Sequence, residues 1–393
     1  MIYRKIVVTA VFLFAALIAN ACITYAQQLE IRFWPEATVY PNIILEGGMF
    51  DCNIQNMAVI NRSGKTVTLE QCQLRLLNKG QVTEDVYISL SQMPQHFAGF
   101  HGNYSRGGLE AWEPEFQLNR LFKKAKLVGT LKLGNNEGIS LRDRYFQFNG
   151  AVDTLQIIFS GKAEDGSAVQ SSVKLAMEVY QSKTPLILPL KGSWNVGNGP
   201  YPHVTHRWVN HQEFGYDFIK MDGEGEVYKG SPTRMQDYYS YDQEIIAPAD
   251  GVIFSTRNDG NDAPLLNDAL LKPGEFMQKI QAYRDSLLGA GGYNEMFGNH
   301  IVIDHETGEY SILVHVKKGS IRVKKGDRVK QGDILGLVGN SGLSNVPHLH
   351  YELVSNPDRM VGRGLPLRLS NLNDQPGSRV LRFGEFVKNG TTQ

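Results

Sequence analysis

Short runs of alternating apolar and polar residues dominate the first half of the chain. They cover residues 31–40, 65–77, 153–161 and 171–182, and polar turn sequences such as NRSGK and AEDGS separate them. Alternation with a period of two is typical of strands with one buried face, and regular short strands indicate an antiparallel sandwich. We therefore predict a mainly β protein in which residues 28–182 form an immunoglobulin-like sandwich domain.

A second set of strand patterns follows the proline-containing sequence QSKTPLILPLKGSW. Residues 308–353 read as short strands broken at KKGD, QGD and GNSG. We place a second β domain at residues 185–393, with an insertion at about 257–297. Within this insertion, PGEFMQKIQAYRDSLLG begins at proline, ends at glycine and repeats its apolar residues on one side, so it predicts a helix. The insertion would cap a groove or pack on the flank of the domain.

The N-terminus has the pattern of an export signal. Two basic residues precede an apolar run over residues 6–18, and small residues permit cleavage after Ala26. We expect residues 1–26 to be a secretory signal peptide and the mature protein to be periplasmic, bound to the cell envelope or secreted. Cys22 leaves a lipid anchor as the alternative. No later stretch is apolar enough to span a membrane.

Charge and cysteine content reduce the number of functions that the chain could have. The 40 basic and 40 acidic residues balance, so the chain lacks the electrostatic footprint of a nucleic-acid-binding protein. Only three cysteines are present, too few for an all-thiolate metal site. Export would permit a disulfide between Cys52 and Cys72, and two buried free thiols are the alternative.

Histidines gather in the second half, where eight of the ten lie between residues 203 and 350. In HLHYEL, strand periodicity places His348 and His350 on one face. Another histidine, His315, lies in the apolar run SILVHV, and Asp217 lies in the apolar strand pattern EFGYDFIKM. A carboxylate in such a strand is costly unless it is paired or binds a cation. Two histidines, one carboxylate and an open position are typical of catalytic zinc.

These segments, in this order, resemble the lysostaphin-like zinc metallopeptidases, which share a duplicated-hybrid-motif β fold. The resemblance covers about residues 185–360 and rests on GYDF, IIAPADGVI, GNHIVIDH, SILVHV, VKKGDRVKQGDILGLVGNSG and PHLHYEL. It implies a zinc metalloendopeptidase that hydrolyses peptidoglycan peptides by a zinc-activated water. It further implies Asp217 and His350 as zinc ligands, with His315 and His348 as general base and oxyanion stabiliser in an unassigned order.

The sequence departs from the family at the remaining ligand. The family spacing would place a histidine at position 213, which is Glu213 here. We expect His206 to supply the ligand, with His211 as the alternative and Glu213 as a less favoured one. His203, next to a proline, is interpreted as a loop residue.

Two other functions stay open at this point. The first is a metal-free domain that binds the cell wall or activates a hydrolase. The second is a carrier domain, because VKKGDRVKQGDILG also resembles biotinyl and lipoyl domains. The remaining histidines are interpreted as surface residues of a loop-like stretch (His96, His101) or as structural residues (His300, His305). The sandwich itself is expected to be a spacer or a recognition domain.

Overall fold

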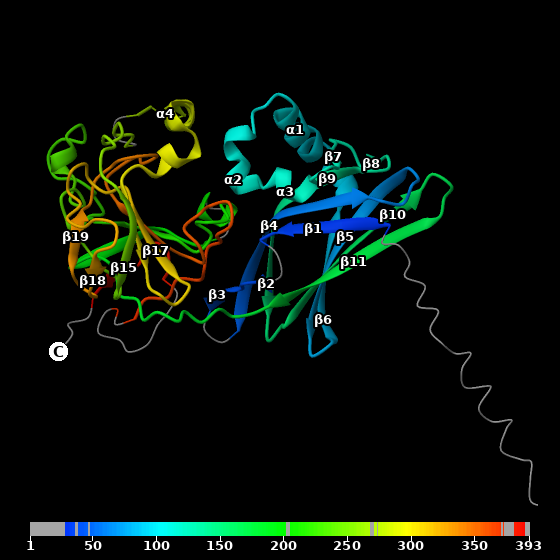
Figure 1. Ribbon diagram of the computed structural model, residues 1–393, viewed down its shortest axis with the longest axis horizontal. Helices are drawn as coiled ribbons and strands as arrows, with labels where there is room; N and C mark the ends of the chain where they lie inside the picture. The colour runs from blue at the N-terminus through cyan, green and yellow to red at the C-terminus, as the bar shows by residue number, and fades with distance from the viewer. Residues whose placement is uncertain are drawn as a thin grey trace, which may run out of the picture.

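A computed structural model describes residues 28–35, 38–45, 48–201, 205–267, 271–272, 274–370, 372 and 381–389. It consists of two β-rich bodies side by side, one in blue to green and one in green to red (Figure 1). The predicted signal peptide, Cys22 and His203 lie outside the described residues. Among the described residues, no helix is both long and apolar enough to cross a membrane.

The N-terminal body is a sandwich of two mostly antiparallel sheets. The first has the order β1-β4-β9-β7, with β3 beside β4, and the second has the order β2-β11-β10-β5-β6, with β8 beside β5. The strands of the first sheet are β1 (Leu29–Trp34), β3 (Asn42–Leu45), β4 (Met49–Asn61), β7 (Lys126–Leu127) and β9 (Glu137–Asn149). Those of the second are β2 (Thr38–Val39), β5 (Val67–Asn78), β6 (Gln81–Ser89), β8 (Lys132–Leu133), β10 (Thr154–Ala163) and β11 (Ala168–Met177).

The alternation seen in the sequence explains how the sandwich closes. In β5 and β10, apolar residues such as Leu74 and Phe159 are buried, and they share one core with Cys52 and Leu141 of the facing sheet. Burying each such side chain contributes about 1.5–3 kcal/mol. Cys52 and Cys72 lie on opposite sheets, and both are buried free thiols. The disulfide hypothesis is therefore wrong, and the two residues serve as small apolar core residues.

A helical segment joins β6 to β7. It comprises η1 (Leu90–Gln92), α1 (Pro94–Ser105), η2 (Glu110–Trp112), α2 (Glu113–Phe116) and α3 (Leu118–Phe122). Apolar residues of α3 pack on Trp34 and Ile60 of the first sheet. The loop expected around His96 and His101 is thus wrong, since both lie on α1, which begins with a proline in its first turn.

The C-terminal body is built on an eight-stranded antiparallel sheet with the order β18-β15-β16-β17-β20-β13-β12-β21. Its strands are β12 (Ser193–Asn198), β13 (Tyr216–Ile219), β15 (Gly251–Arg257), β16 (His300–Asp304), β17 (Tyr310–Val314), β18 (Arg328–Val329), β20 (Leu349–Val354) and β21 (Phe386–Lys388). A two-stranded sheet of β14 (Glu244–Ile246) and β19 (Ile334–Leu337) accompanies it, and short 3-10 turns form η3 (Thr205–Trp208) and η4 (Met235–Asp237).

The two faces of this sheet differ sharply near its centre. Tyr216 and Phe218 of β13 and Leu349 and Tyr351 of β20 are all buried in the main core. Asp217 and His350 lie between these pairs, and they point to the opposite face of the sheet because side chains alternate along a strand. Register pairs Asp217 directly with His350, so the sheet itself brings these two polar side chains together.

The insertion covers part of this polar face. It contains the predicted helix, α4 (Glu275–Gly291), followed by η6 (Tyr293–Phe297). Tyr293, Met296 and Phe297 pack on Val302 and on apolar residues of β17 and β20. Helix α4 itself has no fully buried residue. The two roles predicted for the insertion, a cap over the groove and an elaboration packed on the flank of the domain, both stay predictions.

Candidate metal centre

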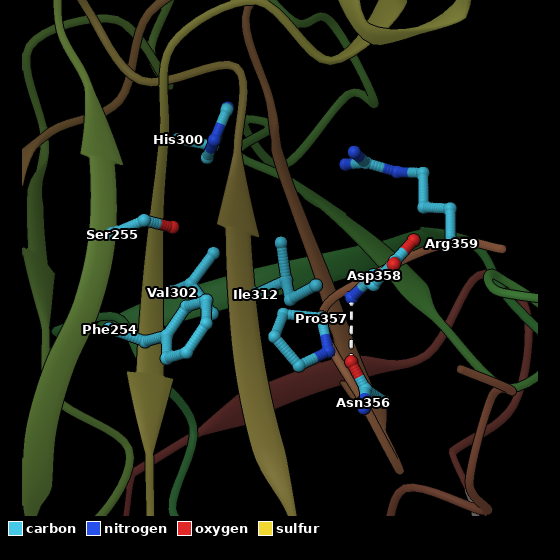
Figure 2. Close-up of a pocket in the computed structure, with 9 residues that line it drawn as sticks. All are labelled: Phe254, Ser255, His300, Val302, Ile312, Asn356, Pro357, Asp358 and Arg359. Atoms are coloured by element: carbon cyan, nitrogen blue, oxygen red, sulfur yellow. Dashed lines mark hydrogen bonds between the residues drawn. The ribbon is translucent and has the colours of Figure 1, made fainter. Parts of the chain in front are cut away.

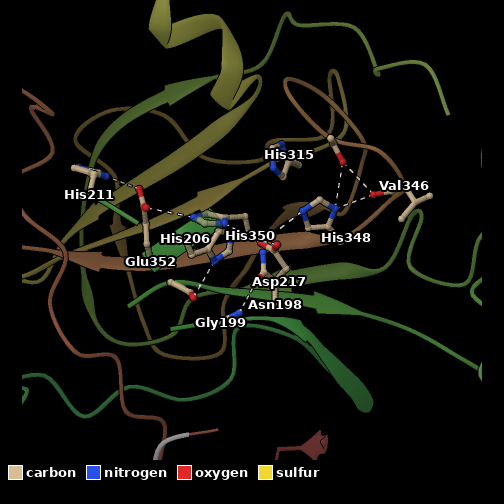
Figure 3. A network of polar contacts seen from close by, with 12 residues as sticks. Asn198, Gly199, His206, His211, Asp217, His315, Val346, His348, His350 and Glu352 are labelled. Atoms are coloured by element: carbon tan, nitrogen blue, oxygen red, sulfur yellow. Dashed lines mark hydrogen bonds and ion pairs between the residues drawn. The ribbon is translucent and has the colours of Figure 1, made fainter. Parts of the chain in front are cut away.

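Asp217 lies at the centre of a cluster of histidines (Figure 3). His350 Nδ1 is 2.8 Å from Asp217 Oδ1, His206 Nε2 is 3.2 Å from Oδ2, and His348 Nε2 is 3.6 Å from Oδ1. One donor atom from each of His206, Asp217 and His350 lies within 4.8 Å of the others. Two neighbouring elements, η3 and β13, and the distant strand β20 supply these donors.

His206 reaches the centre from the 3-10 turn before β13. Its Nδ1 donates to the carbonyl of Gly215 at 3.1 Å, which leaves Nε2 directed at Asp217. Gly215 also leaves room for His350, since a Cβ at position 215 would lie only 3.2 Å from Cε1 of that ring. The ring of His206 lies 4.7 Å from that of His350, nearly perpendicular to it.

The other two candidates for this ligand lie elsewhere. The Nδ1 atom of His211 contacts Oε1 of Glu352 at 2.8 Å. Glu213 is buried and forms an ion pair with Arg207. The structure thus brings His206 to Asp217 and engages His211 and Glu213 with other partners. Assignment of His206, Asp217 and His350 as ligands stays a prediction.

The two predicted catalytic histidines border the same cluster. His348 Nδ1 donates to the carbonyl of Val346 at 2.8 Å, and His315 Nδ1 donates to the carbonyl of Ser341 at 2.6 Å. Since a carbonyl only accepts, each Nδ1 carries the proton and each Nε2 presents a lone pair. The His315 and His348 rings are 4.7 Å apart. His315 has φ of +66°, a rare and strained conformation for a residue with a side chain.

Burial and mutual contacts set the charges of the cluster. Burial alone would raise the pKa of Asp217, but its contacts with His206, His348 and His350, including hydrogen bonds from His206 and His350, hold it well below its usual range. Burial would lower the pKa of His350, but hydrogen bonds to Asp217 and Glu352 raise it to about 9. Burial lowers the pKa values of His315 and His348, so both are neutral near pH 7.

Glu352 is a residue that the sequence argument missed. It is fully buried, its Oε2 lies 3.3 Å from Nε2 of His350, and its Oε1 binds His211. Burial would raise its pKa, but the two histidines hold the carboxyl well below its usual range. The signal was present in HLHYEL, because residues 348, 350 and 352 share strand parity. Carboxylates in this position fix the orientation of a metal-binding imidazole.

The donor set fits a metal ion that accepts nitrogen and oxygen ligands. Two imidazoles and one carboxylate converge, and each histidine has its other nitrogen occupied by an acceptor. The three donor atoms lie within 4.8 Å of one another, close enough for a single ion to bind all of them. The proton on Nδ1 of His350 is the one that a bound metal would displace.

A hollow of about 230 Å³ is lined by residues of β15, β16 and β17 and by residues 356–359 (Figure 2). Its residue His300 lies on the same sheet face as His350. Register pairs His350 with Val314 and Val314 with His300, and directly opposed residues share a face. A neighbouring hollow of about 410 Å³ shares Pro357, Asp358 and Arg359 with the first.

Arg359 is the main cationic group of the shared wall. Its guanidinium lies 3.3 Å from the centroid of the Phe297 ring and donates to Asn294 Oδ1 at 3.1 Å. Within the part of the chain that the structure describes, no carboxylate lies within 4 Å of its nitrogens. Burial lowers its pKa. This guanidinium therefore retains donors for an anionic group in the hollows.

Comparison with known proteins gives consistent matches. Residues 273–361 match Peptidase family M23. The chain is 45% identical over 74 residues to an uncharacterized metalloprotease of Buchnera aphidicola subsp. Baizongia pistaciae, covering 19% of each protein. It is 36% identical over 77 residues to the peptidoglycan DD-endopeptidase ShyC of Vibrio cholerae, covering 20% of this chain and 17% of that protein. The chain thus spans less than a fifth of the length of these relatives.

Among solved structures, the catalytic domain of lysostaphin from Staphylococcus simulans aligns with 19% identity and a TM-score of 0.25, over 44% of this chain and 88% of that one. The family match confirms the resemblance predicted from the ordered motifs. The match to peptidase family M23 covers residues 273–361, and these residues include His315, His348 and His350.

Proposed function

We propose that this protein is an exported zinc metallopeptidase that hydrolyses amide bonds of bacterial peptidoglycan peptides. The observation that carries the proposal is the convergence of His206, Asp217 and His350, with His315 and His348 beside them. Relatives named as peptidoglycan DD-endopeptidases support the substrate class. The metal-free alternative is not favoured, because the donor atoms face one another.

Each side chain has a role in this proposal. His206, Asp217 and His350 would hold zinc, which when bound supplies a Lewis acid that polarises the scissile carbonyl and lowers the pKa of water. His348 and His315 present Nε2 lone pairs toward the centre, so one accepts the proton of the attacking water and passes it to the departing amine. The other, when protonated, stabilises the developing oxyanion.

The face of β15, β16 and β17 would hold the substrate peptide. Both hollows are lined by residues 357–359, and the first is also lined by Val302 and Ile312 on the sheet face that carries His350. Arg359 would bind a free carboxylate of the peptide, a group that suits its planar donors. The insertion, whose η6 packs on the same face, would limit access from one side.

The same proposal covers the organisation of the chain. Residues 28–182 and 185–393 would be its two domains, because each has its own large hydrophobic cluster. The N-terminal one would be an immunoglobulin-like variant, since its two sheets face one another across a shared core. Residues 1–26 would direct export to the periplasm, the envelope or the medium.

The test compares the purified mature protein with a His350→Ala variant and a His101→Gln control. His101 lies on α1 of the sandwich, outside the cluster. We expect wild type and the control to bind one zinc and to release soluble peptides from purified peptidoglycan. The His350→Ala variant should neither bind zinc nor release peptides, and its circular dichroism spectrum should be the same as that of wild type. Full cleavage by that variant would refute the assigned site.

A further inference from the structure

The segment that carries His206 and His211 is held from the N-terminal sandwich. We define residues 205–215 as the ligand loop. Arg207, the residue after His206, is only 1% exposed and lies between two carboxylates. One is Glu213 of the ligand loop, and the other is Asp51 of β4, which is also fully buried. An ion pair thus joins strand β4 of the sandwich to the residue adjacent to a predicted metal ligand.

Neighbouring residues of β4 bind the backbone at the same point. The amide of Asn53 donates to the carbonyl of Arg207 at 2.6 Å, and the amide of Gln55 donates to it at 3.3 Å. Asp51, Asn53 and Gln55 alternate along β4, so the three side chains share one face. This face of the sandwich therefore holds both the side chain and the backbone of one residue.

A third contact holds the middle of the loop. Glu115 of α2 is buried and accepts a hydrogen bond from the backbone amide of Asn210 at 3.0 Å. The hydroxyl of Tyr293 in the insertion also donates to Glu115. The sandwich, the ligand loop and the insertion thus meet through one buried carboxylate.

We propose that the N-terminal sandwich, acting through Asp51 and Asn53 on Arg207, positions His206 and thereby sets the affinity of the centre for its metal. The proposal rests on the function proposed above for the ligands. Arg207 and Asp51 are positioning residues, since neither touches the predicted metal donors. The sandwich would then be a structural component of the metal site, in contrast to the spacer or recognition domain predicted from sequence.

The physical reason is that a short 3-10 turn does little to fix the position of its own residues. The intrinsic stability of η3 is small because it has only four residues. His206 retains one ring hydrogen bond of its own, to Gly215. Fixing the next residue by buried charge-assisted bonds removes freedom that metal binding would otherwise have to restrict.

The test uses the full chain with Asp51→Ala, Asp51→Asn and Asn53→Ala. Asp51→Ala is informative because it removes the contact from the sandwich, while Glu213 of the ligand loop still accepts from the guanidinium of Arg207. Asn keeps an oxygen acceptor for the guanidinium and should restore the contact. The control is Tyr180→Phe, which removes a different contact between the two bodies, a 2.6 Å hydrogen bond to buried Glu309.

Zinc affinity is measured by competition with a chromophoric chelator, cobalt(II) spectra report the geometry of the centre, and melting temperatures of the metal-free proteins report stability. We expect Asp51→Ala and Asn53→Ala to weaken zinc binding about tenfold to 100-fold, as outer-shell substitutions do, whereas Asp51→Asn and Tyr180→Phe stay near wild type. Wild-type affinity in both alanine variants would overturn the proposal, as would an equal loss in Tyr180→Phe. A protein that binds zinc but leaves peptidoglycan intact would refute only the proposed peptidase function.

Discussion

Replacing Glu352 with glutamine should weaken metal binding while the fold is retained. The carboxylate lies between two histidines, 2.8 Å from Nδ1 of His211 and 3.3 Å from Nε2 of His350. Both of its oxygens accept, and its side chain is 1% exposed. Glutamine keeps the shape but offers one oxygen only, and its amide group would face an N–H of one of the two rings.

The size of the effect follows from the contact that is lost. A hydrogen bond to a buried charged group contributes about 1.5–3 kcal/mol. Since about 1.4 kcal/mol corresponds to a factor of ten in a binding constant, zinc affinity should fall about tenfold to 100-fold. Part of the loss arises because the imidazole of His350 no longer has a partner that fixes its proton on Nε2.

The assay is zinc competition on the full chain, with Glu309→Gln as the matched control. Glu309 is equally buried in the same body, but it binds Tyr180, Ser182 and backbone amides of residues 183 and 184, and touches no histidine of the cluster. The control should lower the melting temperature without changing zinc affinity. Unchanged affinity in Glu352→Gln would refute the reasoning, as would an equal loss in Glu309→Gln.

Three further predictions use other parts of the molecule. Burial raises the pKa of Glu213 from 4.5 to about 7, so the folded protein binds this proton more tightly than the unfolded chain does. The free energy of unfolding should therefore decline by about 3 kcal/mol as the pH rises from 4.5 to 7. In Glu213→Gln, denaturation measured across this range should show a weaker dependence of stability on pH, and an unchanged dependence would contradict the prediction. Burial raises the pKa of both Cys52 and Cys72, so mass spectrometry should find them alkylated without reductant only after unfolding, whereas a disulfide would leave them unlabelled. Arg359→Gln should raise KM about tenfold for peptides with a free carboxylate, and an equal rise for amidated peptides would count against a carboxylate subsite.

The sequence predicted those parts of the site that local periodicity determines. His348 and His350 are two positions apart, and Asp217 interrupts an apolar alternation, so each could be assigned to a polar face without knowledge of the fold. The helix at 275–291 was equally visible, because its half-buried apolar residues repeat on one side. In these cases a single element contains the information.

The rest depends on pairing between distant segments. His206 is bound by Gly215 at the end of the ligand loop, whereas His211 is bound by Glu352 of β20, 141 positions away. His211 has the same strand parity as Asp217 and His206 does not, so strand periodicity gives no guide to the residues of a 3-10 turn and the loop after it. The contact between Asp51 and Arg207 spans 156 positions, and no local pattern marks it.

The contact between Asp51 and Arg207 also has a consequence for folding. Unfolding of the sandwich alone would remove Asp51 from the buried guanidinium of Arg207, and a hydrogen bond to a charged group contributes about 1.5–3 kcal/mol. The two bodies should therefore melt as one cooperative unit, although each has a core of its own. A ligand that binds only the native state stabilises it by mass action. Zinc added to the full chain should then raise the melting temperature of the N-terminal sandwich, which contains none of the predicted ligands.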